Sequence, residues 1–109
     1  MNYQIQISSV AESEADKAYL WIAQHLGTEP AKVWYSQLLK TIQSLAIMPN
    51  RCTLAPENAK FSQEIRQLVY GKGRNSYRIL FTVLNEQNPP VIRILHIRHA
   101  ARPPLLDIN

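Results

Sequence analysis

Residues 70–81 read YGKGRNSYRILF, and this stretch decides the fold. The two glycines within residues 71–76 predict a tight turn, because glycine adopts turn conformations at no steric cost. From Tyr77 every second residue is apolar through Val83, which predicts a strand that buries one face and turns polar residues to the other. Residues 65–70 precede the turn and form the first arm of the predicted β-hairpin.

A third strand is predicted to follow at Val91–Arg98, which is apolar apart from Arg93 and His96. Such a near-continuous apolar run is typical of an interior strand. The connecting turn, residues 86–90, is short, so the three strands should form an antiparallel meander. Prolines at positions 103 and 104 predict that the chain then leaves the sheet.

The first half of the chain predicts one strand and two helices. Residues 3–7 alternate between apolar and polar side chains, which is the period of a half-buried strand. Ser9 followed by Glu12 is the signature of a capping box, and apolar residues at helical spacing continue to about Leu26. Gly27 suits the position that follows a helix end.

A second helix is predicted to begin at Thr28, whose hydroxyl suits a helix cap, and to stop before Pro49. The short link between the helices predicts an αα-hairpin, and residues 49–63 are expected to be mostly loop. The order β-α-α-β-β-β indicates an α+β fold, with the hairpin packed on one face of an antiparallel sheet. We expect residues 1–109 to form a single domain whose other sheet face, or its rim, is left to the cations.

Charge and cysteine content narrow the functional classes. Residues 50–109 hold nine Lys or Arg against four Asp or Glu, within a chain of net charge +4. This surplus predicts a nucleic acid, an acidic protein or both as partners. Cys52 is the only cysteine, so no internal disulfide and no cysteine-based metal site can form. The chain has no signal-peptide pattern and no long apolar span, so we expect a cytoplasmic protein that does not enter a membrane. Separately, we expect it to need no cofactor.

Three segments, taken in order, resemble one known family, the RelE/ParE superfamily of toxins from bacterial type II toxin–antitoxin systems. Tyr77–Phe81 resembles the family's central strand, and Ile94–Arg102 looks like its closing strand with a basic end. Ile65–Leu68 is similar to the strand before them. The resemblance covers nearly the whole chain, and it implies a toxin that a cognate antitoxin holds inactive.

The resemblance implies one of two activities. RelE-like members cleave ribosome-bound mRNA in the A site without a metal, and ParE-like members inhibit DNA gyrase and are not nucleases. Our first prediction is mRNA cleavage, and gyrase inhibition is the alternative. A third hypothesis, outside the toxins, is a simple nucleic-acid-binding or protein-binding module. The best-known nucleases of the family carry a tyrosine near the C-terminus, whereas no aromatic residue follows Phe81 here, and this departure keeps the gyrase alternative open.

Metal-free RNA cleavage needs a proton donor, a proton acceptor and fixed cations around one phosphate. The resemblance places Arg78 at the family's phosphate-binding arginine and His99 at a strand end where a catalytic histidine occurs. A solvated strand arginine and a structural histidine are the alternative interpretations. Either Glu57 or Glu64 could act as the base, or simply carry surface charge. We expect Arg78 and His99 to meet at one anion pocket that contains no metal.

Further cations are predicted to bind the nucleic-acid backbone around that pocket. They are Arg66, Lys72, Arg74, Arg98 and Arg102. Two of them, Lys72 and Arg74, lie in the glycine-containing turn, where they equally suit a solubilising role. His96 lies within an apolar strand, so we expect it to form a structural hydrogen bond.

The antitoxin is expected to contact the chain through both apolar and charged groups. Its apolar segments would lie over the helices or extend the sheet edge, and its acidic residues would offset the basic half. The aromatic residues of the helices are expected to belong to the core or to this interface. They are Tyr19, Trp21, Trp34 and Tyr35.

Overall fold

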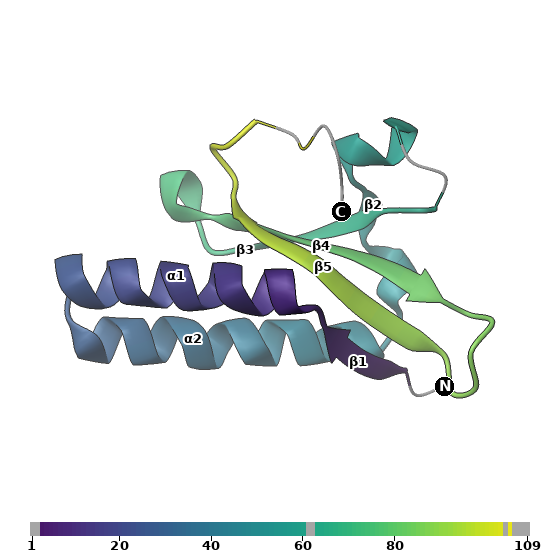
Figure 1. The fold of residues 1–109 in the computed structure, drawn as a ribbon, viewed down its shortest axis with the longest axis horizontal. Helices are drawn as coiled ribbons and strands as arrows, with labels where there is room; N and C mark the ends of the chain where they lie inside the picture. Colours follow the sequence, from purple (N-terminus) through teal and green to yellow (C-terminus); the bar gives the residue numbers. More distant parts are fainter. Residues whose placement is uncertain (1–2, 61–62, 104, 106–109) are drawn as a thin grey trace.

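The computed structural model describes residues 3–60, 63–103 and 105, and it has the α+β order that the sequence predicts (Figure 1). The two long helices are α1 (Ser9–His25) and α2 (Thr28–Gln43). The strands are β1 (Gln4–Ile7), β2 (Thr53–Leu54), β3 (Arg66–Tyr70), β4 (Tyr77–Leu84) and β5 (Val91–His99). Short 3-10 helices occupy the connections: η1 (Ser44–Ala46), η2 (Pro49–Arg51), η3 (Pro56–Lys60) and η4 (Gly73–Asn75).

The strands form one mixed sheet in the order β1-β5-β4-β3-β2. The predicted meander is confirmed, since β3, β4 and β5 pair antiparallel. The first strand, β1, lies parallel to β5, with Gln4 opposite Val91 and Ile7 opposite Ile94. Parallel pairing needs a long crossover, which the helices and the meander supply. The short strand β2 lies in the segment that was expected to be loop. The sequence did not predict it, because two residues are too few to show a period.

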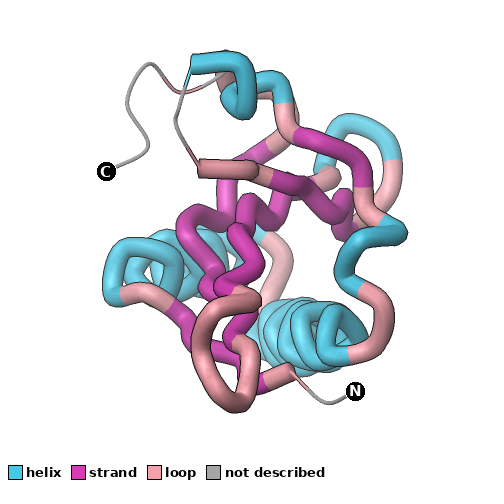
Figure 2. The backbone as a smooth tube through the Cα atoms, turned by 90° about the vertical axis from the view of Figure 1, so that its right-hand side faces the viewer, coloured by secondary structure: helices cyan, strands magenta, loops and turns pink. Residues whose placement is uncertain are grey.

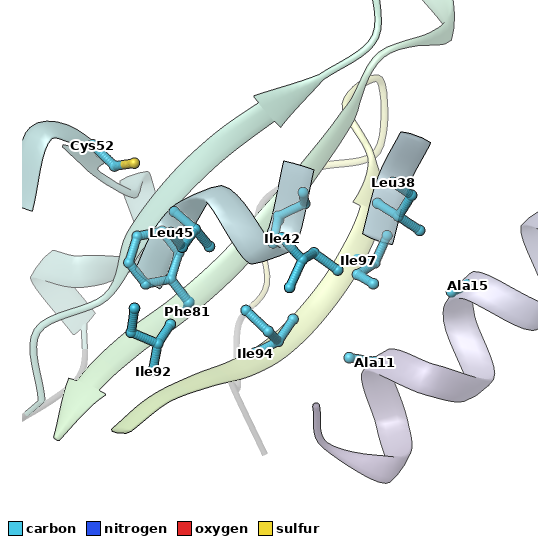
Figure 3. Close-up of a cluster of buried hydrophobic side chains, with 11 residues drawn as sticks. Ala11, Ala15, Leu38, Ile42, Leu45, Cys52, Phe81, Ile92, Ile94 and Ile97 are labelled. Carbon is cyan, nitrogen blue, oxygen red and sulfur yellow. The ribbon is translucent and has the colours of Figure 1, made fainter. Parts of the chain in front are cut away.

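The main core lies between the helical hairpin and one face of the sheet (Figure 3). Small side chains at Ala11 and Ala15 line α1, and α2 contributes Leu38 and Ile42. The sheet contributes Phe81, which is fully buried, together with isoleucines of β4 and β5. The apolar residues at helical spacing and those at strand spacing therefore pack against each other in this one core.

The other face of the sheet is also covered, which differs from the open face expected from the sequence. The segment that carries η3 lies on the opposite side of the strands from the long helices (Figure 2). Ala55, Ile65 and Leu80 form a second cluster, against which Leu95 and Leu105 pack. Cations on this face therefore lie beneath a layer of chain.

One β-bulge interrupts the pairing of β4 with β5. Consecutive residues of β4 lie opposite residues of β5 that are two apart, so Leu95 is the extra residue. A one-residue slip exchanges the two faces of a strand. Beyond the bulge, Arg98 lies opposite Arg78 and His99 lies opposite Tyr77.

The start of α1 is tied to the edge of β5 at the point where β1 ends. The capping residue is Ser8 and not Ser9, the residue that the sequence pattern favoured. Ser8 Oγ accepts a hydrogen bond from the Ala11 N–H and donates one to the Leu95 carbonyl. One serine thus joins the helix start to the sheet.

Both ends of α2 differ from the predicted ones. Gly27 precedes the helix with a φ of 109°, a conformation that glycine adopts far more readily than other residues. Thr28 is already helical, and no side chain caps the helix start. The α-helix ends at Gln43, several residues before Pro49, because the 3-10 helix η1 takes over the chain there.

Replacing Ser8 by alanine is expected to lower the free energy of unfolding by about 1–2 kcal/mol, because the cap of α1 is lost. The bond to the Leu95 carbonyl is lost as well. Urea unfolding of the purified variant measures the change. Ser9→Ala is the matched control and should change the free energy by less than about 0.5 kcal/mol, since Ser9 is exposed. Equal losses for the two variants would contradict the assignment of the cap.

Candidate functional site

Arg78 is buried and bound on β4 by a carboxylate from η3. Its Nη1 and Nη2 donate to Glu57 Oε1 and Oε2 over 3.0 and 2.7 Å, and Nη1 also donates to Gln67 Oε1 over 3.0 Å. Arg78 is 8% exposed and Glu57 is 1% exposed. This bidentate ion pair has the geometry in which a guanidinium would bind a phosphate. The internal carboxylate therefore occupies the side of Arg78 that an external anion would need.

Glu57 also connects the sheet to the C-terminal segment. The backbone N–H of Leu105 donates to Glu57 Oε2 over 3.0 Å, and Arg98 Nη2 donates to the Pro103 carbonyl over 3.0 Å. Burial lowers the pKa of Arg98, and the positive charge of Arg102 lowers it further. Among the described residues, Arg98 Nε is buried without a hydrogen-bond partner. These contacts make Arg98 and Arg78 parts of a covered polar layer.

The Arg78 guanidinium lowers the pKa of Glu57 from its usual 4.5 to about 2, chiefly through the hydrogen bonds that it donates. Burial of the carboxylate acts in the opposite direction, and the Leu105 N–H adds to the lowering. Glu57 is therefore charged in the folded protein at every pH above about 2.

Acid is expected to destabilise the fold through Glu57. Its pKa is lower in the folded chain than in the unfolded chain, so its contribution is complete above about pH 4.5 and is lost as the pH falls toward 2. The shift corresponds to about 3 kcal/mol. Urea unfolding between pH 6 and about pH 2.5 measures it, and Glu57→Gln should show a shallower loss over the same range. Identical pH profiles for the two proteins would contradict the assignment.

His99 lies on the sheet face opposite to Arg78. Its ring lies edge-on to Tyr77 with centroids 5.2 Å apart, and Tyr77 in turn contacts Trp34 at 5.2 Å. The backbone N–H of Ala101 donates to His99 Nδ1 over 3.2 Å, which places the proton of a neutral ring on Nε2. The expected anion pocket shared by Arg78 and His99 is therefore wrong, because neighbouring register positions point to opposite faces.

The five other predicted cations fall into two groups. Arg66 and Arg98 form hydrogen bonds within the protein. Arg66 donates to Glu64 Oε1 and to the Cys52 carbonyl over 2.8 and 2.6 Å. Lys72, Arg74 and Arg102 are exposed. The exposed cations lie at one end of the sheet, where the Ala100 N–H donates to the Ser76 carbonyl and joins the turn after β5 to the residues beside η4 (Figure 1).

His96 has the structural role that its apolar strand predicts. Its Nδ1 lies 3.1 Å from Glu14 Oε1, and the same oxygen accepts the Ile97 N–H over 2.9 Å. Glu14 thus covers the edge of β5 beyond the last residue of β1. The hydrogen bond expected of His96 is confirmed, and it ties α1 to the sheet.

The sequence did not indicate the hollows that the helical hairpin carries, and two of them are lined by aromatic side chains. One is a groove of about 640 Å³ over the two helices. It is lined by Asp16, Tyr19, Lys32, Tyr35, Ser36, Leu39 and Lys40. The other is a cavity of about 290 Å³ between the end of the hairpin and the end of the sheet. It is lined by Trp21, Ile22, Leu26, Pro30, Trp34, Asn75 and Tyr77, and we call it the aromatic corner.

The sequence offers no signal for the aromatic corner beyond the apolar and aromatic character of its side chains, because their exposure is visible only in the structure. Trp21 and Leu26 are 55% and 64% exposed, and Leu26 is the last residue of the apolar pattern that predicts the first helix. Sequence reasoning assigned Trp21 and Trp34 to the core or the antitoxin interface. Trp34 does pack against the core cluster, whereas Trp21 stacks on His25 with ring centroids 4.2 Å apart.

Within residues 3–60, 63–103 and 105, no group of three or more His, Cys, Asp or Glu side chains is placed to hold a metal ion. No helix in the same part of the chain combines the length and apolar character that crossing a bilayer requires.

Comparison with known proteins gives a consistent result. The family model described as the ParE toxin of the type II toxin–antitoxin system parDE matches residues 5–104. Among solved structures, a chain from the chromosomal ParDE TA system of P. aeruginosa superposes with a TM-score of 0.70 at 18% sequence identity. The match covers 89% of this chain and 95% of that chain. No curated protein gives a significant sequence match.

Proposed function

The chain belongs to the ParE toxin family of type II toxin–antitoxin systems, and from this premise we propose that it inhibits DNA gyrase. As the toxin component of such a system it has a cognate antitoxin as partner. Gyrase inhibition was the alternative to mRNA cleavage in the sequence-based prediction. Family membership favours it, because the resemblance associates ParE-like members with gyrase and not with RNA.

The ion pair between Arg78 and Glu57 is the observation that supports this proposal most strongly. A metal-free ribonuclease needs a free cation beside the scissile phosphate. Arg78 already donates three hydrogen bonds to protein oxygens in a buried site. His99, the candidate for proton transfer, lies on the other face of the sheet. The two groups that mRNA cleavage would require at one phosphate are thus separated by the sheet itself.

The antitoxin is proposed to cover the groove over the two helices. Tyr19, Tyr35 and Leu39 line this groove, and two lysines flank it. An amphipathic helix buries its apolar face in a groove of this kind, and acidic residues beside that face would pair with the lysines. This placement agrees with the expectation that the antitoxin lies over the helices.

Gyrase and ribosome assays on the same culture test the proposal. Induced expression should arrest growth, stabilise cleaved gyrase–DNA complexes and leave mRNA intact, and co-expression of the antitoxin should relieve the arrest. His99→Ala should inhibit supercoiling within about twofold of the wild type. A ribonuclease that used His99 for proton transfer would lose about 10²–10⁴-fold in rate. New A-site cuts in mRNA together with unaffected gyrase would overturn the proposal.

A further inference from the structure

The aromatic corner exists because the helical hairpin extends past the end of the sheet (Figure 1). The hairpin contributes Trp21, Leu26 and Trp34, and the end of the sheet contributes Tyr77 and Asn75. The two walls meet where the Trp34 and Tyr77 rings contact each other at 5.2 Å. Beyond this contact, none of the strands in the described part of the chain covers the sheet-facing side of the hairpin (Figure 1).

Trp21 is exposed and yet held in position. Its ring stacks on His25, and His25 Nδ1 donates to the Trp21 carbonyl over 2.8 Å. A large aromatic side chain that is ordered before binding loses little conformational entropy when a partner covers it. Trp and Tyr are also the residues that most often dominate binding energy at protein interfaces. The corner therefore has the composition of an interface centre.

Positive charge borders the corner on the sheet side. Lys72 and Arg74 lie on or beside η4, next to the lining residue Asn75, and Arg102 lies in the turn that is joined to Ser76. No Asp or Glu occurs in residues 70–77 or 99–103. On the helix side, Glu29 lies 3.7 Å from Lys32, which offsets its charge. The uncompensated charge around the corner is positive.

We propose that the aromatic corner binds an acidic segment of gyrase that carries one large apolar side chain. This inference rests on the proposed function. A cavity of about 290 Å³ can take a single bulky side chain, and the flanking cations would pair with acidic residues on either side of it. The surface of a DNA duplex presents phosphates and recessed base edges, and its apolar thymine methyl groups lie within the major groove, so it offers no bulky projecting side chain to fill such a cavity. The groove assigned to the antitoxin shares no lining residue with the corner.

Two substitutions with two controls test this inference in a supercoiling assay with purified gyrase. Trp21→Ala and Arg74→Glu should each raise the concentration for half-maximal inhibition, by about 30-fold for Trp21→Ala. Arg74→Lys keeps the charge and should retain most of the activity. Val33→Ala removes an apolar side chain of similar exposure that lines neither hollow, so it should stay within about twofold of the wild type. Thermal melting establishes that each variant is folded, and Leu26→Ala replaces Trp21→Ala if the latter is not.

The outcomes separate this inference from the proposed function. If wild-type protein fails to inhibit gyrase, the proposed function itself fails. If wild-type protein inhibits and Trp21→Ala inhibits equally, only the inference is overturned. It is also overturned if Trp21→Ala loses antitoxin binding while still inhibiting gyrase, because the corner is then an antitoxin site. Binding of the wild type to a DNA duplex alone, abolished by both substitutions, would assign the corner to nucleic acid and overturn the inference as well.

Discussion

Glu57→Ala is expected to lower the free energy of unfolding by about 3–5 kcal/mol. The substitution leaves the Arg78 guanidinium buried without its counter-charge, and removing one partner of a buried ion pair costs about this much. The Leu105 N–H also loses its acceptor. Urea unfolding at pH 7 measures the loss.

A control pair and a double variant sharpen this experiment. Glu64→Ala breaks the ion pair with Arg66 and should cost less than about 1 kcal/mol, because the Glu64 side chain is 58% exposed. Combining Glu57→Leu with Arg78→Met removes both charges from the same buried place. It should recover most of the stability lost in Glu57→Ala, because apolar residues of similar volume often replace buried ion pairs without loss. A loss of less than about 1 kcal/mol in Glu57→Ala would contradict the buried pair.

Phe81→Ala should cost about 3–5 kcal/mol, the usual range for deleting a buried aromatic side chain. Phe81 is fully buried in the core between the sheet and the helices (Figure 3). Its removal is expected to leave a cavity that the surrounding side chains fill only in part. Chemical unfolding of the variant provides the value.

Val69→Ala is the matched control for Phe81→Ala. Val69 lies on the neighbouring strand β3 and is 52% exposed, so its truncation should cost about 0.5 kcal/mol or less. Phe81→Leu keeps most of the volume and should fall between the two. If Phe81→Ala and Val69→Ala cost the same, the core does not lie where the structure places it.

Local patterns explain why so much of the fold was predictable. The alternation from Tyr77 to Val83 and the helical spacing before Leu26 each report the same buried surface. Both patterns arise from neighbours in the sequence, and periodicity detects such neighbours directly. The helix caps were less predictable, because Ser8 and Ser9 have the same chemistry and differ only in whether the hydroxyl reaches the Ala11 N–H.

The bulge in β5 explains why Arg78 and His99 do not share one face of the sheet. If the register that pairs Leu84 with Val91 continued without a bulge, His99 would lie opposite Ser76, on the same face as Arg78. The single insertion moves His99 to the helix side of the sheet. Neither alternation nor turn length shows where such an insertion falls. The ion pair between Arg78 and Glu57 could not be predicted either, because Glu57 lies 21 positions away in a short 3-10 helix that has no periodic signal.

The parallel pairing of β1 with β5 has a consequence for how the toxin is made. Residues 4–7 are synthesised before residues 91–94, and they cannot take their place in the sheet until residues 91–94 have also been made. Contacts between segments this far apart form late, since the loop between them must first close. Chains that terminate before residues 91–94 therefore lack an assembled sheet, and a cell that translates this message is exposed to working toxin only after β5 has been made.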